Sequence, residues 1–93
     1  MKNKKLDKIR NKLDKLDLKM LKIIKARTML VNKVLKEKKF KNQIVDKERI
    51  KKILSKIRTQ SIKKKIDPKI TNKIWRSMIQ SFIDYEFRNF KKK

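Results

Sequence analysis

The chain has 93 residues and a formal net charge of +23, and it contains neither cysteine nor histidine. These absences exclude disulfides, thiolate chemistry, a histidine base and a zinc site of the usual Cys or His type. A length of this order and 38% apolar residues predict one domain over residues 1–93 with a modest core. No apolar run approaches a membrane span and no signal-peptide core is visible, so we expect a cytoplasmic protein.

The positive charge raises the possibility of a nucleic-acid partner. A bias towards A/T-rich codons, which also supply isoleucine and asparagine, offers a simpler origin for the lysines. The lysines are spread along the whole chain, only 6% of residues are aromatic, and no reader motif is present. We therefore do not favour a nucleic-acid partner, and a basic helical nucleic-acid-binding protein is kept as an alternative. Such a charge would also attract small anions.

The first segment, from about residue 4 to 37, has an apolar heptad pattern. Its apolar positions alternate at spacings of three and four and form a seam, which consists of Leu6, Ile9, Leu13, Leu16, Met20, Ile23, Leu30 and Val34, with Arg27 in the same series. The pattern predicts a single helix that reaches roughly 50 Å at ~1.5 Å per residue. Such a helix exceeds what a compact chain of this size can cover, so the seam predicts a homodimer.

Three cations lie on or beside this seam. Arg27 occupies a seam position, where an arginine can bind an anion, but it can also extend to solvent or set the register of a coiled coil. Arg10 and Lys38 lie whole heptads apart on one flank of the seam. A solvated charge is the ordinary reading of either one.

Two further helices follow a loop at residues 39–45. Asp46 is the expected N-cap of a helix from about 47 to 64, and Lys63–Lys65 end that helix. Asp67 and Pro68 are typical of a helix start, so the third helix runs from Pro68 to about Phe90. Apolar residues predict its inward face: Ile70, Ile74, Trp75, Met78, Ile79, Phe82 and Ile83. The fold class is therefore all-α, with a long, a short and a medium helix.

Several polar residues accompany these helices. Asp46 and Arg49 suit a cap with a local ion pair, and Glu86 lies one turn from Phe82 on the apolar side of the third helix. Each has an ordinary structural explanation. Taken with Arg10, Arg27 and Lys38, however, they supply three guanidinium groups, an ammonium and a possible donor, which suits a small molecule with two carboxylates.

These positions resemble the all-helical (type II) chorismate mutase family over nearly the full chain. The resemblance rests on the order and spacing of IRNKLDKLD (Ile9–Asp17), Arg27 with LVNKV (Leu30–Val34), Lys38, VDKER (Val45–Arg49), IDP (Ile66–Pro68) and IWRSMIQSFIDYE (Ile74–Glu86). It implies an intertwined homodimer of three-helix chains with active sites shared between them. The implied reaction is the rearrangement of chorismate to prephenate in phenylalanine and tyrosine biosynthesis, without a metal or cofactor.

The resemblance also implies roles for individual residues. Arg27, and Arg10 from the other subunit, would hold the two substrate carboxylates. Lys38 would contact a carboxylate and the ether oxygen whose bond breaks, and Glu86 would face the same oxygen. Arg49 and the backbone at Asp46 would frame the ring and its hydroxyl.

Glu86 stands where many relatives have glutamine. An ionised carboxylate would repel the negative charge that develops on the ether oxygen, so we expect Glu86 to act in its protonated form.

Two apolar departures leave a second reaction open. Ile50 stands where several relatives carry a glutamate, and Phe82 stands where some carry a serine. Both resemble isochorismate pyruvate-lyases, which form salicylate. We favour the mutase, because a lyase site would more naturally keep the amide at position 86. A coiled-coil interaction protein without catalysis is a further alternative.

Overall fold

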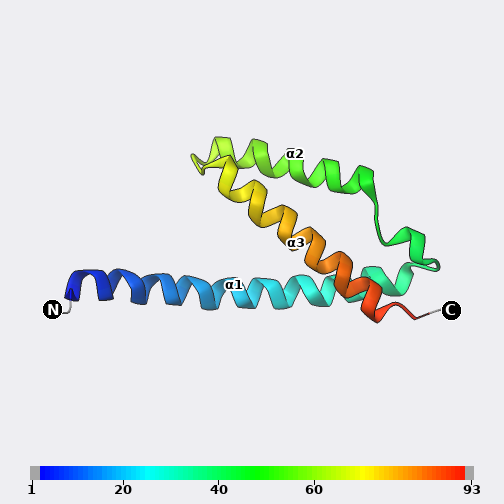
Figure 1. Ribbon diagram of the computed structural model, residues 1–93, viewed down its shortest axis with the longest axis horizontal. Helices are drawn as coiled ribbons and strands as arrows, with labels where there is room; N and C mark the ends of the chain where they lie inside the picture. Colours follow the sequence, from blue (N-terminus) through cyan, green and yellow to red (C-terminus); the bar gives the residue numbers. More distant parts are fainter. Residues whose placement is uncertain (1–2, 92–93) are drawn as a thin grey trace. The chain divides into compact units, whose positions relative to one another are not determined.

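The computed structural model describes residues 3–91, which form three α-helices and one short 3-10 helix (Figure 1). The helices are α1 (Lys4–Glu37), α2 (Lys47–Lys63) and α3 (Pro68–Asn89), and η1 (Lys41–Gln43) lies between α1 and α2. The predicted all-α class and the three helices are confirmed, with boundaries within about a residue of those expected. The chain divides into two compact units, Met1–Val31 and Asn32–Lys93.

The first unit is the amino-terminal part of α1. Asn3 caps this helix, since its side-chain oxygen accepts a hydrogen bond from the Leu6 amide at 3.1 Å. The seam residues of this unit are exposed, with exposed fractions between 38% for Leu6 and 61% for Ile23. A helix with such an uncovered apolar stripe gains stability when another apolar surface covers it.

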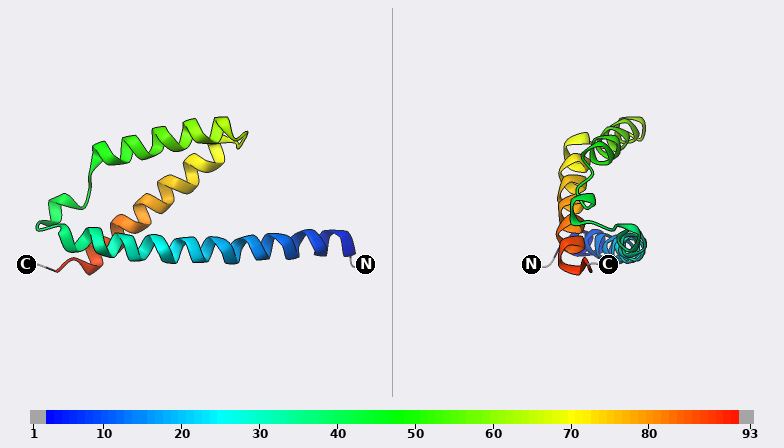
Figure 2. Two further views of the ribbon diagram at one scale, coloured as in Figure 1. Left: turned by 180° about the vertical axis from the view of Figure 1, so that it is seen from behind. Right: turned by 90° about the vertical axis from the view of Figure 1, so that its right-hand side faces the viewer.

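The second unit contains the last turns of α1, the connection to α2, and the hairpin of α2 and α3. The two helices of the hairpin are in contact, and they diverge away from their connecting turn (Figure 1; Figure 2 shows the same from behind). Asp46 caps α2 through the Arg49 amide, at 3.0 Å, and Asp67 caps α3 through the Lys69 amide, at 2.9 Å. Both caps agree with the sequence prediction.

The turn between α2 and α3 ends α2 with a left-handed residue. Lys65 has φ 57°, its amide donates to the Ile62 carbonyl, and the Ile66 amide donates to the Ser61 carbonyl at 2.8 Å. This pattern of two reverse hydrogen bonds is the Schellman motif, which usually places glycine at the left-handed position. The chain contains no glycine, so a lysine adopts that conformation here.

The hairpin interior is small and partly polar. Beside the turn, the buried hydroxyls of Ser61 and Thr71 lie 2.7 Å apart. The predicted inward face of α3 is wrong at two positions, because Ile70 and Ile74 are 56% and 43% exposed. The covered face of α3 is instead centred on the line from Thr71 to Glu86, and helical periodicity places both isoleucines beyond its edge.

Candidate active site

The second unit contains a largely buried ion pair between two predicted site residues. The Lys38 ammonium lies 2.9 Å from Oε1 of Glu86, and the exposed fractions of the two side chains are 18% and 9%. Lys38 directly follows α1, and Glu86 lies in the last turns of α3. Two opposite charges held this far from water interact much more strongly than a surface pair.

Local structure explains how these two side chains meet. The Lys38 amide donates to the Leu35 carbonyl at 3.2 Å, which tightens the end of α1, and Leu35 is buried. The Tyr85 hydroxyl donates to Oδ1 of Asn32 at 2.8 Å. Two adjacent α3 residues therefore make these contacts: Tyr85 bonds to α1, and Glu86 bonds to the residue that directly follows α1.

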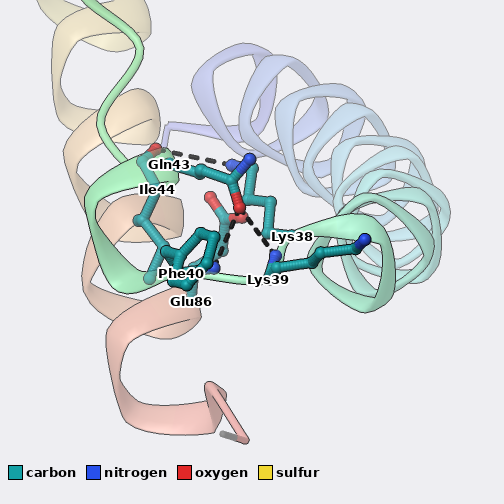
Figure 3. A network of polar contacts seen from close by, with 6 residues as sticks. All are labelled: Lys38, Lys39, Phe40, Gln43, Ile44 and Glu86. Atoms are coloured by element: carbon teal, nitrogen blue, oxygen red, sulfur yellow. Dashed lines mark hydrogen bonds and ion pairs between the residues drawn. The ribbon is translucent and has the colours of Figure 1, made fainter. Parts of the chain in front are cut away.

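The Lys38 ammonium has a second neighbour in the connecting turn, residues 38–46. It lies 3.5 Å from the Ile44 carbonyl oxygen, a long contact, while the Ile44 side chain is only 3% exposed (Figure 3). The sequence predicted a loop with a few apolar anchors at residues 39–45, but it did not predict this contact. The side chain of Lys38 is thus directed by Glu86 on α3 and by the backbone of its own turn.

Lys38 also lines an open depression of about 620 Å³ together with Asp46. Its other lining residues come from the connecting turn and the start of α2: Asn42, Gln43, Val45, Lys47 and Glu48. The local ion pair that would be the ordinary explanation of Asp46 and Arg49 does not form in the part of the chain that the structure describes. The Asp46 carboxylate accepts from the Arg49 amide instead, and both residues are exposed.

The two apolar residues that differ from the family pattern, Ile50 and Phe82, lie on the hairpin. Phe82 is half-buried and lies one turn before Glu86 on α3. Ile50 lines a separate hollow of about 200 Å³ between α2 and α3, whose other lining residues are Leu54, Arg76, Ile79, Gln80 and Ile83. Among the residues that the structure describes, no carboxylate residue lines the hollow around Ile50. The depression beside Lys38, in contrast, is lined by Asp46 and Glu48.

Arg10 and Arg27 belong to the first unit. Arg10 is exposed, whereas Arg27 is half-buried. Within residues 3–31 only Arg27, Thr28 and Val31 are half-buried, while the leucines of the seam are exposed. An arginine that is better covered than its apolar neighbours does not behave as a simple solvated charge.

Two classes of site receive no support from the described residues. Between Asn3 and Lys91 no group of acidic, cysteine or histidine side chains is arranged to hold a metal ion. Over the same range, no helix has both the length and the apolar content that crossing a bilayer requires.

A comparison with models of protein families shows to which family the chain belongs. The model of the family described as chorismate mutase type II matches residues 9–87. The chain belongs to the type II chorismate mutase family. It is therefore an isomerase with chorismate mutase-type activity, as the sequence resemblance implied. The matched range includes all the candidate site residues, from Arg10 to Glu86. Searches among curated proteins and among solved structures gave no match.

The buried ion pair makes a prediction about stability. Lys38→Met leaves the Glu86 carboxylate buried without its cation, so we expect a loss of about 3 kcal/mol in the free energy of unfolding. Adding Glu86→Gln to this variant removes the uncompensated charge and should recover most of the loss. Urea denaturation at one protein concentration measures both effects.

The neighbouring Lys39 provides the control, because its side chain is exposed. Lys39→Met should unfold at the native urea concentration. If Lys38→Met behaved like Lys39→Met, the ion pair would contribute nothing to stability.

Proposed function

We propose that the chain is a cytoplasmic homodimeric enzyme, a single domain over residues 1–93, that rearranges chorismate to prephenate in phenylalanine and tyrosine biosynthesis. The observation that supports this most directly is the shielded Lys38 ammonium, 2.9 Å from Glu86, in a chain of this family. A positioned cation in a site with little water is what the breaking of an ether bond requires.

The reaction sets two physical demands. The flexible substrate must be held in a folded shape in which its two reacting ends approach each other. Negative charge then develops on the ether oxygen as its bond to carbon lengthens, and donors fixed in advance stabilise that charge. Neither demand calls for a nucleophile or a metal, which suits a sequence without cysteine and histidine.

The proposed roles divide between binding and bond cleavage. Arg27 and Arg10 hold the substrate carboxylates through their planar, two-pronged donors, with Arg10 contributed by the second chain. Lys38 donates to a carboxylate and to the ether oxygen. Glu86 donates to the same oxygen once it carries a proton.

The remaining candidates shape the site around the ring. The backbone at Asp46 and the side chain of Arg49 contact the ring hydroxyl and its edge. Phe82 supplies an apolar wall one turn from Glu86. No cofactor takes part in this proposal.

The exposed seam of α1 supports the proposal that two chains pair to form a homodimer. Its apolar side chains, 38–61% exposed, repeat with the heptad spacing of helices that pair along their length. Pairing would bury this stripe and would bring Arg10 of one chain towards the site of the other.

The ion pair has a consequence for binding. In the ligand-free chain Lys38 is already neutralised by Glu86, so a substrate carboxylate competes with Glu86 for the same ammonium. Once a substrate carboxylate binds beside Lys38, two negative groups would face each other. Uptake of a proton by Glu86 relieves that repulsion and at the same time creates the donor that the ether oxygen needs.

The apolar residues at positions 50 and 82 favour one alternative, an isochorismate pyruvate-lyase that releases pyruvate and leaves salicylate. Ile50 and its hollow provide no acid for a ring hydroxyl. The mutase is preferred because a carboxyl at position 86 can serve as a proton-dependent donor to the ether oxygen.

Identification of the products tests the proposal. Purified chain is offered chorismate and isochorismate in separate reactions, and we expect prephenate from the first. Lys38→Met should remove most turnover, whereas Lys39→Met should retain it. Pyruvate with salicylate from isochorismate would establish the lyase instead, and turnover of neither compound would contradict both readings.

The protonation of Glu86 predicts a pH dependence. In this proposal only a protonated Glu86 donates to the ether oxygen, so turnover of the native chain should fall as pH rises. Glu86→Gln presents an amide N–H at every pH, and its profile should therefore be flatter. Measuring kcat for both chains across the pH range in which they stay folded checks this.

Folding is monitored by circular dichroism over the same range. A Gln variant that retains the full pH dependence of the native chain would show that another group controls the rate.

A further inference from the structure

Gln43 closes the connecting turn with its side chain. Its amide oxygen accepts hydrogen bonds from the backbone amides of Lys39, at 2.6 Å, and of Phe40, at 2.9 Å (Figure 3). The backbone amide of Gln43 in turn donates to the Phe40 carbonyl at 3.0 Å, and the backbone amide of Ile44 donates to the Lys41 carbonyl at the same distance. One glutamine oxygen therefore satisfies two successive backbone donors just beyond the end of α1.

These contacts fix the backbone on both sides of the Lys38 side chain. The first bonded amide, that of Lys39, belongs to the residue that follows Lys38, so its position determines where the Lys38 Cα lies. The last backbone bond of the turn determines where the buried Ile44 lies, and the Ile44 carbonyl is 3.5 Å from the Lys38 ammonium. The Lys38 Cα, from which the side chain extends, and the Ile44 carbonyl beside its ammonium thus belong to a single closed turn.

We propose that Gln43 is a positioning residue for Lys38, and this proposal rests on the proposed function. By holding the turn closed, it sets the direction of the Lys38 side chain so that the ammonium stays between the Ile44 carbonyl and Glu86. The substrate then meets a cation that is already in place, which lowers the reorganisation needed to reach the transition state. Gln43 itself donates nothing to the reacting atoms.

The chemistry of the turn defines which substitutions are informative. Gln43→Leu keeps a similar volume and removes the acceptor oxygen, and with it both hydrogen bonds to the backbone. Gln43→Glu keeps an acceptor oxygen at the same distance from the backbone, so both amides can still be bonded. Lys41→Leu is the control, because Lys41 lies in the same 3-10 turn and its side chain is exposed.

Kinetics of these variants distinguish positioning from general stability. We expect Gln43→Leu to lower kcat/KM for chorismate by roughly tenfold or more, mostly through kcat, because a misdirected ammonium loses interactions made in the transition state. Gln43→Glu should retain most of the native activity, and Lys41→Leu should match the native chain. In a Lys38→Met background, Gln43→Leu should produce little further loss, since the two residues act through one group.

Three results would overturn the proposal. The first is an equal loss from Gln43→Leu with and without Lys38, which would mean that Gln43 does not act through the ammonium. The second is a Gln43→Glu chain as impaired as Gln43→Leu, which would mean that the acceptor bonds are not responsible. The third is native activity in Gln43→Leu.

A spectroscopic measurement keeps this test separate from that of the reaction. NMR of the ligand-free chain should show faster hydrogen exchange at the Lys39 and Phe40 amides in Gln43→Leu, together with shifted resonances of the Lys38 side-chain methylenes. Lys41→Leu should show neither change. Unmoved Lys38 resonances would overturn the positioning role, whatever the activity. A native chain that converts neither chorismate nor isochorismate would instead reject the proposed function.

Discussion

The proposed site depends on the ion pair between Lys38 and Glu86. It joins residues 48 positions apart, in the last turns of α3 and directly after α1, and it keeps both charges largely out of water. Buried ion pairs of this kind contribute little net stability compared with well-packed apolar residues. A pair that is costly to build and gives little stability suits a functional role, and the membership of the chain in the type II chorismate mutase family supplies one.

The ion pair also distinguishes Lys38 from the many other lysines that give the chain its high positive charge. A net charge of +23 attracts dianions to the whole surface, but most of these lysines are exposed and well solvated. Lys38 differs because an acidic partner, a backbone carbonyl and a closed turn restrain it. In this account the surface lysines raise the local concentration of substrate, and a few restrained cations perform the chemistry.

Local features of the sequence were sufficient to predict the helices. The caps at Asp46 and Asp67 and the proline at the start of α3 act over a few residues, so reading them needs no knowledge of the fold. The left-handed Lys65 was not foreseen, because that position normally calls for glycine and the sequence has none. The exposure of Ile70 and Ile74 was also missed, since only packing decides which part of an apolar stripe is covered.

The candidate site was predictable as a set of residues but not as a geometry. Family resemblance selected Lys38 and Glu86, whereas their direct contact depends on how α3 returns to the end of α1. The supporting contacts of Tyr85 and Gln43 were missed for the same reason. Gln43 did carry a local signal, because it follows Phe40 by three residues, the spacing at which a side chain can reach back to a capping amide.

The central claim is that one substrate lies among cations of two chains, with Lys38 from one and Arg10 from the other. Mixing unfolded Arg10→Ala and Lys38→Met chains in equal amounts, and refolding them together, tests this directly through chorismate turnover. Half of the dimers are then mixed, and each mixed dimer holds one intact site and one doubly altered site. The account predicts that two nearly inactive chains regain about a quarter of the native activity per chain, as two-fold symmetry requires. A mixture no more active than the separate variants would contradict it.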